Sequence, residues 1–135
     1  MPASDKLHIT VATDGDVARA VLQAGNTARE VGFDASCSCR ISTAVSELAR
    51  NILKYAGRGE LIITRCRHGA RNSVEIVTTD HGPGIPDVNT ALKDHVSTGG
   101  TLGLGLPGVK RLMDEFELTT EPGQGTRVLI RKYLV

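Results

Sequence analysis

The chain has 135 residues, of which 40% are hydrophobic and 23% are charged, and its formal net charge at pH 7 is +1. This length and composition predict one globular domain over residues 1–135, and the near-neutral charge gives no case for a nucleic-acid or membrane surface. No apolar run reaches the roughly 20 residues that cross a bilayer, and the N-terminus lacks the apolar segment of a signal peptide, so we expect a cytoplasmic protein.

The first part of the chain predicts a strand, two long helices and a hairpin. Apolar and polar residues alternate over residues 6–13, which predicts a half-buried strand. Apolar residues recur at helical spacing over residues 14–31 and again over about 37–55, which predicts two amphipathic helices. Two runs rich in β-branched residues, 60–66 and 73–80, flank a short polar link and predict a hairpin.

The second part of the chain predicts shorter elements. Residues 87–95 are consistent with a short helix, and the glycine- and threonine-rich residues 97–105 have no regular pattern. Pro107 suits the first position of a further helix. Residues 118–121 and 126–134 predict a final hairpin around a proline- and glycine-rich turn. The buried face of the helix that starts at the proline is expected to carry Val109, Leu112, Met113 and Phe116.

Together these elements predict an α+β fold. About five strands, mostly joined by hairpins, and two long helices favour a two-layer sandwich. We expect a mixed, largely antiparallel sheet with the helices on one face. The pattern shows no internal repeat and no linker.

The second long helix carries an unusual set of polar residues. Glu47, Asn51 and Lys54 are spaced by four and three residues, so they project from one side of the helix. Asparagine is a mediocre helix former, but its amide oxygen can ligate Mg²⁺. A carboxylate one turn earlier can accept a proton from a hydroxyl, and a lysine one turn later can face phosphate oxygens. The alternative is a solvated face with Glu47–Arg50 and Glu47–Asn51 contacts, which explains the charges adequately and the asparagine poorly.

The first glycine-rich loop follows the strand that ends at Asp80. A carboxylate at a strand end, followed by Gly82-Pro83-Gly84, places an acceptor beside backbone that a flat ring can approach. The exocyclic amine of adenine is a suitable donor to such an acceptor. The alternative is an ordinary turn of aspartate, glycine and proline after a strand.

The second glycine-rich loop, residues 98–108, contains the pattern G-x-G-x-x-G from Gly103 to Gly108. A dinucleotide-binding fold needs a strand directly before this pattern and a long α/β region after it, and the chain offers neither. The free N–H groups at the start of the following helix, residues 106–110, still predict an anion-binding site.

Four short motifs, in this order along the chain, resemble the four boxes of the GHKL superfamily of ATPases and kinases. They read Glu47-x-x-x-Asn51, Asp80-x-Gly82-x-Gly84, Gly103-x-Gly105 and Gly125-Thr126. Within the superfamily the chain looks most like the RsbT serine/threonine kinases of bacterial stress-signalling modules, over residues 41–52, 80–87 and 103–116. The resemblance implies the GHKL, or Bergerat, ATP-binding fold.

The resemblance also implies a role for each matching residue. Glu47 would be the general base, Asn51 would hold Mg²⁺ on the ATP phosphates, and Lys54 would face those phosphates. Asp80 would bind the adenine amine, with Thr126 behind the adenine. The other ATP-binding positions implied by the resemblance line the adenine pocket or contact the phosphates: Gly82, Gly84, Ile85, Thr98, Gly99, Gly100, Gly103, Leu104, Gly105 and Leu106.

The function implied by the resemblance is an ATP- and Mg²⁺-dependent protein serine/threonine kinase. Its substrates would be STAS-domain proteins of the stressosome scaffold (RsbS- or RsbR-like), and it would switch partner to activate a PP2C-type phosphatase (RsbU-like). One alternative is an anti-sigma-factor kinase of the RsbW or SpoIIAB kind that binds a sigma factor, although residues 107–111 favour the first reading. The other alternative is a non-catalytic, nucleotide-gated binding module.

Overall fold

A computed structural model of the chain describes residues 6–84 and 105–135. The predicted helix over 87–95 and the irregular stretch up to residue 104 lie outside these residues. In chain order the elements are β1 (Lys6–Val11), α1 (Asp14–Val31), α2 (Ala35–Tyr55), β2 (Gly59–His68), β3 (Arg71–Asp80), α4 (Gly105–Leu112), β4 (Glu115–Glu121) and β5 (Gly125–Tyr133).

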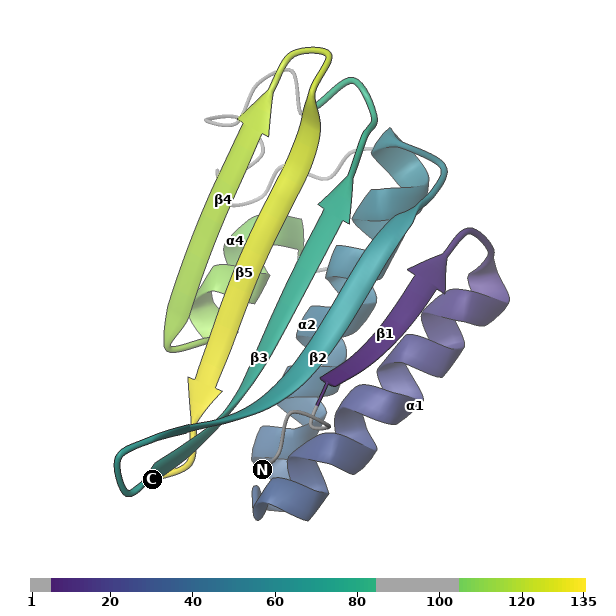
Figure 1. Cartoon of the computed structure of the whole chain (residues 1–135). Coiled ribbons are helices and arrows are strands. Elements are labelled where there is room, and N and C mark those ends of the chain that lie inside the picture. Colours follow the sequence, from purple (N-terminus) through teal and green to yellow (C-terminus); the bar gives the residue numbers. More distant parts are fainter. Residues whose placement is uncertain (1–5, 85–104) are drawn as a thin grey trace.

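The five described strands form one sheet in the order β1-β2-β3-β5-β4, and each neighbouring pair is antiparallel. Figure 1 shows α1, α2 and α4 on one face of this sheet, with α2 behind its centre. The structure therefore confirms the two-layer α+β sandwich. Among the described residues, no helix is long and apolar enough to cross a membrane.

The core lies between α2 and the inner face of the sheet. The four apolar positions that draw the stripe on α2 are all buried, and so are the inward residues of the central strands that face them. Burial of each such aliphatic side chain contributes about 1.5–3 kcal/mol. The residues concerned are Ile41, Val45, Leu48 and Ile52 on the helix and Leu61, Ile63, Val74, Ile76 and Ile130 on the strands.

The helix α2 begins earlier than the sequence pattern predicts. Asp34 is its N-cap and accepts a hydrogen bond from the backbone N–H of Cys37 at 2.8 Å, so the helix starts at Ala35 rather than at residue 37. The same hydrogen bond lowers the pKa of Asp34 below its ordinary value. The first turn of α2 is thus defined by a polar cap, which a search for apolar periodicity does not detect.

The prediction that Phe116 lies on the buried face of the helix after Pro107 is wrong. The helix α4 stops at Leu112, and Phe116 lies in β4, where it packs half-buried against the core. Asp114 ends the helical course, because its backbone N–H donates to the carbonyl of Arg131 and its carboxylate accepts from the N–H of Tyr133. Pro107 is the third residue of α4 rather than the first, a position in the first turn that also needs no backbone donor.

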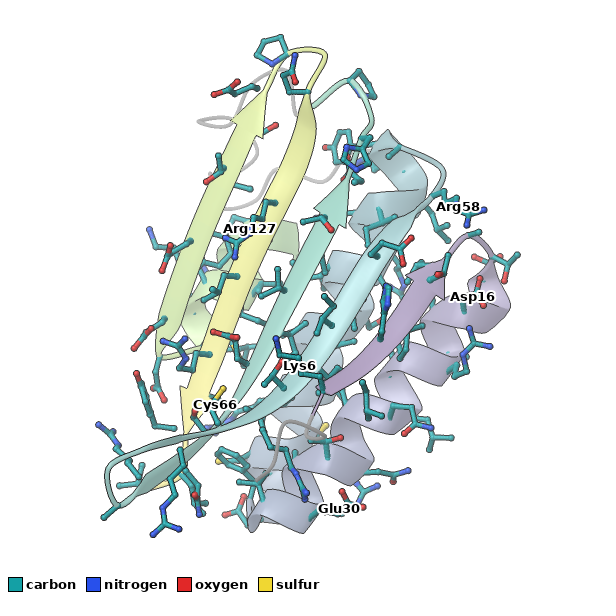
Figure 2. The ribbon with its side chains drawn as sticks, viewed as in Figure 1. Lys6, Asp16, Glu30, Arg58, Cys66 and Arg127 are labelled. Atoms are coloured by element: carbon teal, nitrogen blue, oxygen red, sulfur yellow. The ribbon has the colours of Figure 1, made fainter. Side chains whose placement is uncertain are left out.

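The opposite face of the sheet carries charged side chains, and none of the described helices covers it. Arg131 of β5 forms ion pairs with Glu75 of β3 and Glu115 of β4, and its neighbours in register are these same two residues. The hydroxyl of Tyr133 also donates to Glu115. Figure 2 shows Arg127 on this open side of β5, two strands away from β2. Four predicted site residues, Asn51, Asp80, Leu106 and Thr126, lie together between the inner face of the sheet and the helices α2 and α4.

Candidate functional site

The side chain of Glu47 is buried at the junction of α2 and α4. Its exposed fraction is 8%, and its Oε1 accepts a hydrogen bond from the backbone N–H of Gly105 at 2.7 Å. Its Oε2 lies 3.4 Å from Nη1 of Arg50, a contact that the solvated-face alternative also predicts. That alternative does not account for the burial, because a glutamate on a solvated helix face has no reason to leave water.

A pocket opens one turn further along α2, between this helix, the end of β3, the start of β5 and the start of α4. Four elements thus contribute to one cavity, and four residues predicted from the sequence are among its walls. Its apolar walls come from the same helix and strand faces that form the core. The lining residues are Leu48, Asn51, Ile52, Tyr55, Thr78, Asp80, Leu106, Thr126 and Val128.

Asp80 lies at the end of β3, with an exposed fraction of 9%. Its Oδ1 accepts a hydrogen bond from the N–H of Gly82 at 3.0 Å, so it also organises its own turn, as the ordinary-turn alternative predicts. Its direct neighbour on β5 is Thr126. The carboxylate therefore serves the turn and lines the pocket at the same time.

Close approach of the backbone explains the glycine that precedes Thr126. Gly125 has a φ of +99°, and a Cβ built on it would lie 2.0 Å from the carbonyl oxygen of Asp80. No side chain fits at this distance, and the positive φ is itself unfavourable for residues other than glycine. Gly125 thus allows β5 to start directly against the pocket end of β3.

The glycines of the first loop have a similar packing role. A Cβ on Gly82 would lie 2.6 Å from the Cβ of Ala56 at the end of α2, and one on Gly84 would lie 2.7 Å from the carbonyl oxygen of Glu121. The loop therefore passes so close to the end of α2 and to β4 that a side chain at either position would clash. Neither glycine is among the residues that line the pocket, so their contact with a bound base stays a prediction.

Lys54 is exposed, and its ammonium group lies 5.2 Å from the centre of the Tyr55 ring. It is not among the residues that line the pocket, although it projects from the same side of α2 as Asn51. Gly105 and Leu106 open α4, the first beside Glu47 and the second in the pocket wall. Six predicted positions lie outside the described residues: Ile85, Thr98, Gly99, Gly100, Gly103 and Leu104.

Three described residues with hydroxyl groups, which lie in or beside the pocket, were not predicted as site residues. Tyr55 follows Asn51 by four residues on α2 and Thr78 precedes Asp80 by two on β3, so helix and strand periodicity place both on the pocket side. Thr120 lies opposite Thr126 on β4, and the two hydroxyl oxygens are 2.9 Å apart. The register that pairs these threonines depends on the turn between the strands, so sequence periodicity alone does not reveal it.

The sequence and the structure both resemble known proteins. Residues 10–132 match the family model of the histidine kinase-like ATPase domain. The serine/threonine-protein kinase RsbT of Bacillus subtilis is 44% identical over 131 residues, which are 97% of this chain and 98% of the relative. An anti-sigma F factor of Caldanaerobacter subterraneus is 35% identical over 98 residues, which are 70% of this chain and 68% of the relative.

A solved structure that contains the RsbU and RsbW domains of a Mycobacterium tuberculosis protein superimposes on this chain with a TM-score of 0.63. The match covers 100% of this chain and 34% of that one, at 19% identity, so it bears on the fold alone. The RsbT match spans almost the full length of both chains at a much higher identity. The chain belongs to the histidine kinase-like ATPase family and, within it, to the RsbT serine/threonine-protein kinases.

Proposed function

We propose that this kinase transfers the terminal phosphoryl group of ATP to a serine or threonine hydroxyl of a STAS-domain protein, with Glu47 as the general base. The observation that carries the proposal is the arrangement on α2. A buried carboxylate lies one turn before Asn51, and Asn51 shares a pocket with Asp80. In this proposal a proton acceptor, a neutral oxygen ligand for Mg²⁺ and a carboxylate for the adenine amine follow one another along one side of the site.

We assign the purine ring of ATP to this pocket because of its lining. Leu48, Ile52 and Val128 offer apolar walls to a flat ring, and Asp80 offers an acceptor to an exocyclic amine. Apolar walls with a few convergent polar groups are typical of small-molecule sites. With the ring in this position, the phosphates would extend along α2 toward Glu47, and Lys54 would approach them from the rim.

Asn51 is the residue that would hold Mg²⁺. Its amide oxygen is a ligand of the kind that Mg²⁺ accepts, together with phosphate oxygens and water. When bound, the ion neutralises charge on the phosphates as the phosphoryl group moves. Asn51 lies at the pocket wall rather than in the core, so its side chain is available to a ligand.

Glu47 would act on the attacking hydroxyl. As the substrate oxygen bonds to the terminal phosphorus, the bond to the leaving oxygen of ADP breaks, and the hydroxyl proton moves to the Glu47 carboxylate. The hydrogen bond from the N–H of Gly105 occupies one acceptor position of Oε1. A carboxylate has about four such positions, so it can accept the proton while α4 stays in place.

The proposed partners follow the relatives. We assign STAS-domain proteins of the RsbS or RsbR kind as substrates and a PP2C-type phosphatase of the RsbU kind as the target of activation, in the cytoplasm. Identity of 44% to RsbT over 97% of the chain supports this choice above the anti-sigma-factor alternative, for which the match is 35% over 70%. Association with a STAS protein but not with a sigma factor, measured by pull-down, is the expected result.

The direct test is transfer of labelled phosphate. The purified chain is incubated with Mg²⁺, ATP labelled at the terminal phosphate and a panel of STAS domains, and phosphoserine or phosphothreonine is identified by mass spectrometry. Glu47→Ala should bind ATP but lose transfer, and Asn51→Ala should lose Mg²⁺-dependent nucleotide binding. Transfer at the wild-type rate by Glu47→Ala would refute the assigned base.

A further inference from the structure

The guanidinium group of Arg50 lies beside the carboxylate that we assign as the base. Its Nη1 donates to Oε2 of Glu47 at 3.4 Å, and this is its one hydrogen bond within the described part of the chain. The Arg50 side chain keeps an exposed fraction of 56%. A guanidinium has five N–H donors, so most of those of Arg50 face solvent, directly next to a buried carboxylate.

The ion pair with Glu47 does not by itself explain an arginine at this position. A half-exposed pair between residues three positions apart on a helix contributes little to stability. Glu47 is already held by the shorter hydrogen bond from the N–H of Gly105, at 2.7 Å. The position of Glu47 therefore does not depend on Arg50, and the guanidinium is available to a second anion.

The direction from which a substrate hydroxyl approaches Glu47 brings it to Arg50. Around the axis of α2, the residues that line the pocket, such as Leu48 and Asn51, lie on one side of Glu47, and Arg50 lies on the other. In phosphoryl transfer the attacking and leaving oxygens lie roughly in line, on opposite sides of the phosphorus. With ADP leaving on the pocket side, the acceptor hydroxyl reaches Glu47 from the side of Arg50.

The exposed charges of the two helices beside the site have a single sign. Every exposed charged side chain of α2 and α4 is basic, and the acidic residue on these helices is the buried Glu47, although the whole chain has a net charge of only +1. A protein that docks against them therefore meets a basic surface, which favours carboxylates on its own side. The exposed basic residues are Arg40, Arg50 and Lys54 on α2 and Lys110 and Arg111 on α4.

We propose that Arg50 determines substrate specificity by binding a carboxylate of the substrate protein that lies close to the acceptor serine or threonine. The planar guanidinium offers paired donors that match the two oxygens of a carboxylate. Docking removes water from Arg50, so a substrate that offers no anion there leaves a cation poorly compensated and is disfavoured. The inference rests on the proposed function, since it requires a protein hydroxyl that is phosphorylated at Glu47.

Steady-state kinetics with a STAS domain that the wild type phosphorylates test the inference. At saturating Mg²⁺ and ATP, Arg50→Gln should lower kcat/KM for the STAS domain about tenfold to a hundredfold, mainly by raising KM. Arg50→Lys keeps the charge but not the paired donors, so it should lose less. The affinity for ATP, measured by titration calorimetry, should stay at the wild-type value in both variants.

Arg19→Gln on α1 is the matched control. Arg19 forms an ion pair with Asp16, also three positions away on its helix, and its side chain has the same exposed fraction of 56%. The helix α1 contributes no residue to the lining of the pocket. Arg19→Gln should therefore keep the wild-type kcat and KM.

Substitutions in the substrate identify the carboxylate that Arg50 binds. The aspartates and glutamates near the phosphorylated residue of the STAS domain are changed one at a time to asparagine or glutamine. One such change should lower kcat/KM of the wild-type kinase as much as Arg50→Gln does, and should have little further effect on the Arg50→Gln kinase.

Three results would overturn the inference: a wild-type kcat/KM for Arg50→Gln, a loss confined to kcat, or substrate changes whose effects all add to that of Arg50→Gln. A loss confined to kcat would mean that Arg50 acts on the base or on the phosphoryl group instead. A wild type that phosphorylates no STAS domain would refute the proposed function.

Discussion

Glu47 and Gly105 are joined by a hydrogen bond of 2.7 Å between positions 58 residues apart in the sequence. The bond connects the middle of α2 to the first residue of α4. The carboxylate that we assign as the base is therefore also a structural acceptor, buried to 8% exposure. Substitutions of Glu47 affect two properties, and the choice of the new side chain separates them.

Glu47→Gln should lose activity and keep most of the stability. The glutamine oxygen still accepts from the N–H of Gly105, but an amide cannot take the hydroxyl proton, so phosphoryl transfer should fall by about 10²–10⁴. Glu47→Ala removes the acceptor as well and should lower the free energy of unfolding by about 1–3 kcal/mol. Urea denaturation and phosphate transfer, measured on both variants, check this. Equal losses of stability in the two variants would contradict the role of the hydrogen bond.

Asp80→Asn should weaken ATP binding with little change in the melting temperature. The asparagine oxygen can still accept from the N–H of Gly82, so the turn is preserved. The ligand, however, loses a charged acceptor, which is worth about 1.5–3 kcal/mol, or roughly a tenfold to hundredfold loss of affinity. Calorimetric titration with ATP provides the measurement. Wild-type affinity would show that the adenine amine does not bind at Asp80.

Gly125→Ala should destabilise the protein far more than Gly123→Ala. Both glycines have positive φ, +99° and +76°, but a Cβ on Gly123 meets nothing within 4 Å. The strain of the backbone conformation should cost about 1–2 kcal/mol at either position. At position 125 the clash with the carbonyl of Asp80 should add several kcal/mol, and β5 should detach at its start. Denaturation midpoints of the two variants compare the effects, and similar values would argue against the tight contact.

Asp34→Asn should make the protein less sensitive to acid. The N–H of Cys37 holds the pKa of Asp34 below its ordinary value of 3.8, so its contribution to stability is complete above that pH and is lost as the pH falls through the lowered pKa. Asparagine is also a good N-cap but does not titrate, so the variant should resemble the wild type at pH 7. Melting temperatures between about pH 5 and 2 should then decline less steeply in the variant.

The fold was predictable wherever burial follows a regular period. The apolar stripe on α2 and the β2–β3 hairpin are long patterns with one buried face, and the structure has both. The errors occur at ends. Asp34 begins α2 through a side-chain hydrogen bond, and Phe116 continues the helical spacing of α4 although the chain has already entered β4. Local polar contacts decide both ends, and hydrophobic periodicity does not report them.

The candidate site was predictable to the extent that its residues are close in sequence or belong to a known motif. Asn51, Asp80 and Thr126 were predicted from three separate motifs, and the structure brings them into one pocket. Helix and strand periodicity could have placed Tyr55 and Thr78 on the pocket side. Thr120 was not, because its relation to Thr126 exists only in the paired strands.

The apolar walls of the pocket belong to the hydrophobic core. Leu48 and Ile52 belong to the central hydrophobic cluster and also line the cavity next to Asn51. If the proposed function is right, a nucleotide in this cavity would also pack against α2 and the sheet. A ligand stabilises the folded state by RT ln(1 + [L]/Kd), so a bound nucleotide should raise the melting temperature of the protein. A smaller side chain at position 48 or 52 would then lower both the nucleotide affinity and the melting temperature. A nucleotide that binds tightly would in turn stabilise such destabilised variants.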